Sequence, residues 1–211
     1  MSKANVKVKE KKVRTKKTAE IKVDCPCTEA VPAEKKDSAH PCHLYLMRHA
    51  KASREYEHYD DSARPLIRRG RKDAKMMRKL FSSMHLQPDL ILCSPALRAA
   101  ETLEEIRKAF SDPEIRFVEE LYLASTADLF RIAKAIPAIK HDVLIIGHNP
   151  GLAEFAEVIC DNAISDDRAY RHMGKKFPTA AAAFIELTRD WKSLGDDTGR
   201  LIEFIRPADL K

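Results

Sequence analysis

Three short, continuous apolar runs constrain the fold of this chain more than any other feature. They occupy residues 43–47 (HLYLM), 90–93 (LILC) and 143–146 (VLII). The second and third runs are apolar at every position, rather than at every second one, which is typical of a strand that is covered on both faces of a parallel sheet. The sequence therefore predicts buried parallel strands at these three places.

Helical patterns lie between and after these runs. Apolar side chains recur at helical spacing in residues 71–81, 96–110, 129–136 and 152–159. Strands that alternate with such helices predict an α/β fold, a three-layer α/β/α domain with a mostly parallel central sheet. Two late apolar segments, 182–187 and 201–205, are expected to add strands, with a turn at Asp196, Asp197 and Gly199.

Composition divides the chain after residue 42. Residues 1–42 hold 11 Lys or Arg against 6 Asp or Glu, whereas residues 43–211 hold 27 against 26. The first 22 residues contain almost no large apolar side chains, so burial cannot offset the entropy of ordering them. We expect a basic, disordered extension at 1–42 and one domain at 43–211. The extension is most simply a solubilising arm, although it offers contact to an acidic partner, and nucleic acid is the less favoured partner.

The cysteines give no sign of a disulfide framework, because the chain has five of them and they are scattered. Cys25, Cys27 and Cys42, with His40 and His43, resemble metal ligands only superficially, since a single C-x-C pair is not typical of a zinc site. No apolar stretch is long enough for a signal peptide or a bilayer span. The sequence therefore predicts a cytoplasmic protein with neither a structural metal nor a membrane segment.

Polar side chains follow each of the three apolar runs directly. They are Arg48 and His49 after the first, Ser94 and Arg98 after the second, and His148 and Asn149 after the third. In open α/β sheets, ligands bind beyond the carboxyl ends of the strands. Guanidinium groups bind phosphoryl oxygens bidentately, and a neutral imidazole beside them can attack phosphorus. Each residue alone is more often structural, and it is their placement at successive strand ends that favours a phosphoryl-transfer site.

The same segments resemble the histidine phosphatase superfamily, which has the phosphoglycerate mutase-like fold. The resemblance rests on residues 46–50 (LMRHA), 94–102 (SPALRAAET) and 147–151 (GHNPG), in the same order and spacing. Within that superfamily the chain is similar to the SixA-type phosphohistidine phosphatases through residues 61–66 (DSARPL), 69–70 (RG) and 177–180 (FPTA). The resemblance covers about residues 43 to 191 and leaves out the basic extension.

The resemblance implies a role for each of these side chains. His49 would be the nucleophile, Arg48, Arg98 and His148 would bind the phosphoryl group, and no metal or organic cofactor would be needed. Ser94 and Asn149 would reinforce the phosphate pocket, although Ser94 is equally well placed to cap a helix that begins near Pro95.

The chain departs from the family pattern at three positions. Ala50 stands where the superfamily usually has Gly, and Ile67 stands where the SixA branch usually has Thr. Asn149 occupies the position of an acidic residue in acid-phosphatase relatives, so their general acid is missing. Mutase-type relatives carry their acid between the second Arg motif and the second His motif, and this resemblance makes Glu120 the catalytic candidate for that role.

Asp60 and Asp61 are further carboxylates near the site, although they could simply pair with Arg64. The sequence thus predicts a metal-independent phosphatase that acts on phosphohistidine in a protein, or on a small phosphorylated metabolite, through covalent catalysis by His49. The alternative is a catalytically idle module that binds a phosphorylated partner. A third interpretation, nucleic-acid binding through the extension, would show steep salt dependence.

Overall fold

The computed structural model describes residues 41–54 and 60–210 of the chain. Most of the predicted basic extension, with Cys25, Cys27 and His40 of the C-x-C pattern, lies outside the described residues. Cys42 and His43 lie in the first strand, which begins one residue before the predicted domain start.

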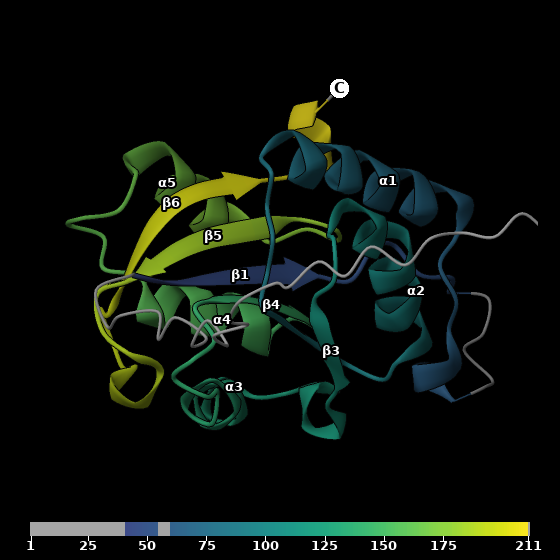
Figure 1. Cartoon of the computed structure of the whole chain (residues 1–211). Helices are drawn as coiled ribbons and strands as arrows, with labels where there is room; N and C mark the ends of the chain where they lie inside the picture. The colour runs from purple at the N-terminus through teal and green to yellow at the C-terminus, as the bar shows by residue number, and fades with distance from the viewer. Residues whose placement is uncertain (1–40, 55–59, 211) are drawn as a thin grey trace, which may run out of the picture. The chain divides into compact units, whose positions relative to one another are not determined.

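A six-stranded, mostly parallel sheet forms the centre of the domain, as predicted (Figure 1). The strand order is β3-β2-β4-β1-β5-β6. The first four of these strands run parallel, and β5 is antiparallel to both of its neighbours. The strands are β1 (Cys42–Arg48), β2 (Leu90–Cys93), β3 (Glu114–Phe117), β4 (Asp142–Gly147), β5 (Ala182–Leu187) and β6 (Gly199–Ile205).

Five α-helices and five short 3-10 helices connect the strands in the described part of the chain. The α-helices are α1 (Arg68–Ser83), α2 (Leu97–Ile106), α3 (Thr126–Lys134), α4 (Gly151–Ile159) and α5 (Asp167–Lys175). The 3-10 helices are η1 (Asp61–Ala63), η2 (Arg107–Ala109), η3 (Glu119–Leu121), η4 (Trp191–Ser193) and η5 (Pro207–Leu210). The first four α-helices correspond to the predicted helical segments, whereas β3 and α5 were not predicted.

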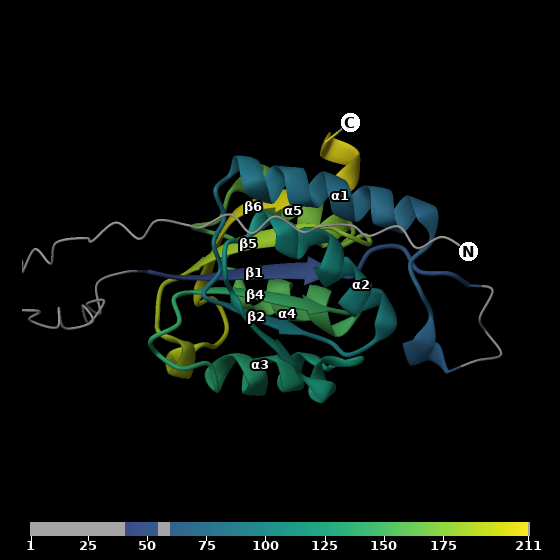
Figure 2. The same ribbon diagram turned by 45° about the vertical axis from the view of Figure 1, so that its right-hand side comes forward.

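The helices cover both faces of the sheet, so the domain has three layers (Figures 1 and 2). Alternate residues of each buried strand point to opposite faces. Met47 and Ile91 pack with α1 and α2 in one hydrophobic cluster, whereas Leu46 and Leu90 pack with α3, α4 and α5 in the other. Burial on both faces explains the runs of consecutive apolar residues in these strands.

The register of the parallel strands brings their carboxyl ends to one level at one edge of the sheet. Arg48, the last residue of β1, pairs with Gly147, and Cys93, the last residue of β2, pairs with Ile146. The next residue along each chain segment is therefore His49, Ser94 or His148. The fold thus places the three strand-end motifs beside one another.

Within the described residues, no helix is both long and apolar enough to span a membrane.

Candidate active site

His49 lies at the centre of the strand-end cluster, with only 8% of its surface exposed. Its Nδ1 is 2.7 Å from the carbonyl oxygen of Ala50, and its Nε2 is 3.3 Å from Nε of Arg98, which donates to it. A carbonyl oxygen can only accept, so Nδ1 carries the ring proton and Nε2 keeps its lone pair. This tautomer leaves Nε2 as the nucleophilic atom.

The surroundings of His49 keep its ring neutral. Burial lowers the pKa of His49 to about 3, with smaller contributions in the same direction from His148, Arg98 and Arg48. The hydrogen bond to Ala50 opposes this change only in part. At neutral pH the imidazole is therefore unprotonated and able to attack an electrophile.

Arg98 is buried, with 2% of its surface exposed, and hydrogen bonds fix the orientation of its guanidinium group. Its Nη1 donates to the backbone oxygen of Asp61 over 2.6 Å, and its Nη2 donates to Oδ2 of Asp61 over 2.8 Å. The carboxylate also accepts from the hydroxyl of Tyr122 over 2.8 Å and pairs with Arg64 over 2.8 Å. Partial burial opposes ionisation, but the hydrogen bonds from Tyr122 and Arg98 hold the pKa of Asp61 below its usual range.

His148 stands next to His49, with ring centroids 4.9 Å apart and 4% of its surface exposed. Its Nε2 is 2.8 Å from Oγ of Ser94, which also accepts from the backbone N–H of Ala96 over 3.4 Å. The Ser94 hydroxyl proton is thus available to Nε2, which favours the tautomer with the proton on Nδ1. That Nδ1 has no hydrogen-bond partner among the described residues. Burial, with Arg98 as the next cause, lowers the pKa of His148 to about 4.

The carbonyl oxygen of Phe177 orients two further side chains. It accepts from Nη1 of Arg48 over 2.9 Å and from Nδ2 of Asn149 over 3.0 Å. Nε of Arg48 is buried and has no hydrogen-bond partner among the described residues. Buried donors are rarely left unpaired, and when they are, a ligand is a common reason.

Thr102 ties the nucleophile loop to α2. Its Oγ1 accepts from the backbone N–H of Ala50 over 2.9 Å and donates to the carbonyl oxygen of Arg98 over 2.6 Å. One hydroxyl thereby holds Arg98 and Ala50, the residue that follows His49 in the sequence. Sequence reasoning did not single out Thr102, although its position one turn after Arg98 is a usable signal.

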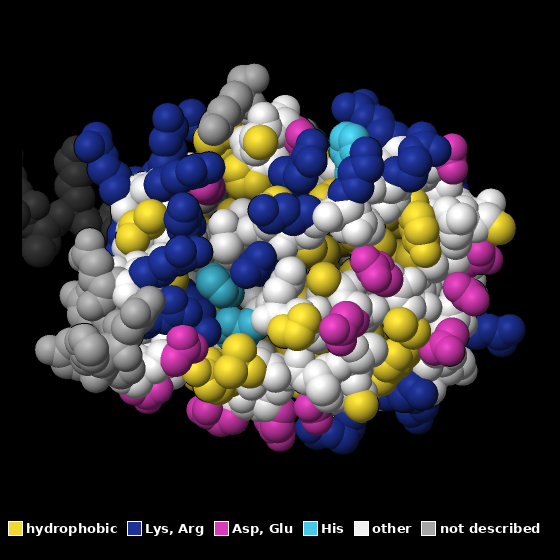
Figure 3. All heavy atoms as spheres, turned by 180° about the vertical axis from the view of Figure 1, so that it is seen from behind, with side chains coloured by type: hydrophobic (Ala, Val, Ile, Leu, Met, Phe, Trp, Pro, Cys, Tyr) yellow, Lys and Arg dark blue, Asp and Glu magenta, His cyan; other side chains and the backbone are white. Residues whose placement is uncertain are grey.

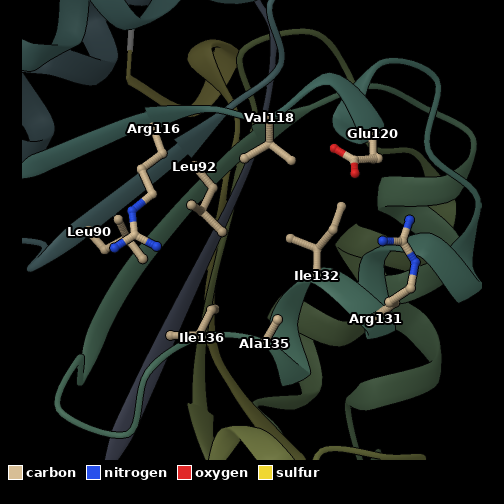
Figure 4. A pocket seen from close by; sticks show the side chains of 9 residues that line it. All are labelled: Leu90, Leu92, Arg116, Val118, Glu120, Arg131, Ile132, Ala135 and Ile136. Atoms are coloured by element: carbon tan, nitrogen blue, oxygen red, sulfur yellow. The ribbon is translucent and has the colours of Figure 1, made fainter.

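The structure does not bring Glu120 into this cluster. Glu120 lines a separate cavity of about 240 Å³ between β2, β3 and α3. Figure 4 shows its carboxylate facing that cavity, on the same side as Arg131. Asp60 also points elsewhere, because its carboxylate binds Ser62. Among the carboxylates of the described residues, Asp61 contacts the cluster, through Arg98.

The cluster can bind an anion and attack it. Among the described residues, the guanidinium groups of Arg48, Arg64 and Arg98 meet the carboxylate of Asp61 here, while both histidines are neutral. Guanidinium groups in a largely buried site suit a phosphoryl group and its developing charge. Within the described residues, no three His, Cys, Asp or Glu side chains are grouped so as to hold a metal ion.

Comparisons with known proteins agree with this geometry. Residues 44–122 match the model of the histidine phosphatase superfamily (branch 1). The uncharacterized protein ML1117 of Mycobacterium leprae is 30% identical over 164 residues, which cover 76% of this chain and 99% of that protein. Phosphohistidine phosphatase SixA of Escherichia coli K12 is 26% identical over 121 residues, or 56% of this chain and 73% of that protein.

Solved structures extend the similarity to the whole domain. A candidate phosphohistidine phosphatase SixA from Nakamurella multipartitia has a TM-score of 0.70 and 25% identity, covering 81% of this chain and 99% of that one. Its counterpart from Agrobacterium tumefaciens has a TM-score of 0.66 and 27% identity, covering 80% of this chain and 100% of that one. From the strand-end motifs, the fold and these matches, we conclude that the chain belongs to the histidine phosphatase superfamily.

Proposed function

We propose that this protein is a phosphatase that removes the phosphoryl group from phosphohistidine in other proteins. The observation that carries the proposal is the buried, neutral His49, whose Nε2 keeps its lone pair and faces the guanidinium of Arg98. Among the similar proteins, several bear the name phosphohistidine phosphatase SixA, which supports this choice of substrate over a small phosphoester.

The reaction takes place in two displacements. Nε2 of His49 attacks phosphorus as the P–N bond to the substrate imidazole breaks, and the leaving nitrogen takes up a proton from solvent. Arg48, Arg98 and His148 bind the phosphoryl oxygens and stabilise the charge of the in-line transition state. Water then attacks the phosphorus of phospho-His49, which releases inorganic phosphate and restores the neutral ring. Covalent catalysis thus divides one difficult step into two easier ones.

A phosphoramidate leaves with less assistance than an alkoxide, so the site can work without a strong general acid. Glu120 was the candidate for that role by chain order, and Asp61 is the carboxylate that the structure places beside Arg98. Steady-state kinetics of Glu120→Gln with a phosphohistidine peptide test whether Glu120 acts as the general acid. A kcat within about twofold of the wild-type value would exclude Glu120, since loss of a general acid typically costs at least about a hundredfold.

The covalent step can be tested by rapid-quench labelling with a phosphohistidine peptide or acetyl phosphate, followed by mass mapping of acid-labile phosphate. We expect a label on His49 in the wild type and none in His49→Asn. His85→Asn is the matched control, because His85 is exposed and has a positive φ of 52°, which Asn tolerates.

The same experiment separates the two predicted functions. Absence of both label and phosphate release in the wild type, with phosphate binding intact, would reject the phosphatase and support the idle recognition module. A label that persists in His49→Asn would instead show that another residue is the nucleophile.

A further inference from the structure

The helix α1 has a much larger excess of basic over acidic residues than the rest of the domain. It contains seven Lys or Arg and one Asp in 16 residues. Outside α1, residues 43–211 contain 20 basic against 25 acidic side chains. The basic and acidic residues of 43–211 nearly balance in number, but the basic excess is concentrated in α1. Basic side chains also crowd around a hollow that contains histidine side chains on the face shown in Figure 3.

Four of these cations form a straight line on the outer face of α1, which we name the basic stripe. Its residues are Arg68, Lys72, Lys75 and Lys79, all exposed and spaced at i, i+4, i+7 and i+11. At 1.5 Å per residue the stripe is about 16 Å long. Like charges one turn apart destabilise a helix, so helix stability does not explain the arrangement.

Few carboxylates neutralise the basic stripe. Lys75 lies 4.0 Å from Glu105, at the limit of an ion pair. Arg68, Lys72 and Lys79 form no ion pair with any residue in the described ranges. Two other cations of the helix do form ion pairs, Arg71 with Glu101 over 2.6 Å and Arg69 with Asp73 over 3.8 Å. The stripe is therefore available to an external anion.

The stripe begins at the catalytic loop. The backbone N–H of Ile67, just before α1, donates to the carbonyl oxygen of Lys51 over 3.0 Å. The first turn packs so closely that a Cβ on Gly70 would lie 2.2 Å from the same oxygen. Lys51 is two residues after His49. A partner whose phosphoryl group reaches His49 therefore meets the start of the stripe.

An apolar hollow lies at the far end of the stripe. It has a volume of about 400 Å³ and is lined by Met76, Leu80 and Leu210, with Lys79 and Ser83 at its sides. An apolar patch bordered by charge is typical of protein–protein interfaces. A surface for nucleic acid would rely on phosphate contacts and would gain little from such a hollow.

We propose that the basic stripe and this hollow form a docking surface for the acidic face of a phosphorylated protein. This proposal rests on the proposed function and names its substrate class, a protein with carboxylates arranged beside its phosphohistidine. A small phosphorylated metabolite in the His49 pocket would be too short to reach along the stripe. Complementary charge accelerates encounter and fixes the orientation in which the phosphoryl group enters the pocket.

The test compares two helical phosphohistidine peptides that differ only in charge. One carries Glu at i+4, i+7 and i+11 from the phosphohistidine, and the other carries Gln at those positions. The enzymes are wild type, Lys72→Glu/Lys79→Glu, and the control Lys134→Glu/Lys192→Glu. The control makes the same change in net charge at exposed residues of α3 and η4, which pack with the opposite hydrophobic cluster.

We expect the wild type and the control to prefer the Glu peptide by about tenfold in kcat/KM at low salt, as electrostatic steering allows. The stripe variant should lose this preference and keep its rate on the Gln peptide. Equal preference in the stripe variant and the wild type, or no preference in the wild type, would overturn the proposal.

Binding measured by fluorescence anisotropy on the unphosphorylated peptides keeps the two proposals separate. If the wild type hydrolyses neither peptide, the proposed function fails, while stripe-dependent binding of the Glu peptide still supports the docking surface. Stripe-dependent binding of a short DNA duplex, without discrimination between the two peptides, would reject a protein partner in favour of nucleic acid.

Discussion

Nη2 of Arg98 donates to Oδ2 of Asp61 over 2.8 Å, and Nη1 donates to the backbone oxygen of the same residue over 2.6 Å. Both terminal nitrogens of a guanidinium that suits a phosphoryl group are therefore engaged by Asp61, one by its backbone oxygen and one by its carboxylate. A carboxylate and a phosphoryl group present similar oxygens to arginine. Substrate and Asp61 should consequently compete for Arg98.

Replacement of Asp61 tests this competition. We predict that Asp61→Asn strengthens competitive inhibition by inorganic phosphate by about threefold, in keeping with the modest energy of a half-exposed ion pair. Asp60→Asn is the control, because Asp60 binds Ser62 and does not contact Arg98. Weaker inhibition in Asp61→Asn would show instead that the carboxylate holds Arg98 in its binding position.

Thr102 should contribute to both stability and turnover. Thr102→Val keeps the shape of the side chain but leaves the buried N–H of Ala50 without its acceptor, which costs about 1–3 kcal/mol. The Ala50 carbonyl that fixes the His49 tautomer should then become less well placed, so kcat should fall more than KM rises. Urea unfolding and steady-state kinetics measure the two effects. If neither the free energy of unfolding nor kcat changed, Thr102 would not contribute to holding the site in place.

The neutral histidines predict a loss of stability in mild acid. In the unfolded chain a histidine protonates near pH 6.5, whereas folded His49 does so at about 3 and His148 at about 4. Between these values the unfolded state binds more protons, so the free energy of unfolding falls as the pH decreases from about 7 towards 4.

Between pH 7 and pH 5, His49 alone should account for about 2 kcal/mol of that loss. Urea unfolding of the wild type and His49→Gln at the two pH values measures the difference. The variant should lose about 2 kcal/mol less than the wild type. Equal losses would mean that the pKa of His49 is not depressed in the folded protein.

Elements that are deeply buried could be predicted from the sequence, whereas exposed elements could not. The strands β1, β2 and β4 were predicted because burial on both faces gives each of them a run of mostly apolar residues. The edge strand β3 was missed because residues 114–117 (EIRF) are largely exposed and alternate with charge. Helix α5 was missed because it buries only Ala169 and Met173.

The site was predictable to the extent that its side chains follow strand ends. Arg48, His49 and His148 meet because parallel strands end at one edge of the sheet. The roles of Tyr122 and of the Phe177 carbonyl oxygen depend on how distant loops fold back, and a backbone carbonyl has no signal in the sequence. Chain order likewise could not show that the turn of η3 directs Glu120 and Tyr122 to different places.

Ser94 should act through His148 rather than on the substrate directly. Its side chain is fully buried, and its hydroxyl is the group that favours the Nδ1-protonated tautomer of His148. We predict that Ser94→Ala lowers kcat by about tenfold, because His148 then spends less time as the correct hydrogen-bond donor to the phosphoryl group. Ser94→Thr retains the hydroxyl and should recover part of the rate if the added methyl group fits.

A purely structural role for Ser94 would give a different pattern. It would lower the free energy of unfolding and the amount of active enzyme, but leave kcat per active site unchanged. Active sites can be counted from the amplitude of His49 labelling, so kcat per labelled site separates the two roles. A wild-type kcat per site in Ser94→Ala would mean that His148 holds its tautomer without the hydroxyl. The predicted helix-capping role of Ser94 was wrong, because the N-cap of α2 is Ala96 and no side chain caps this helix.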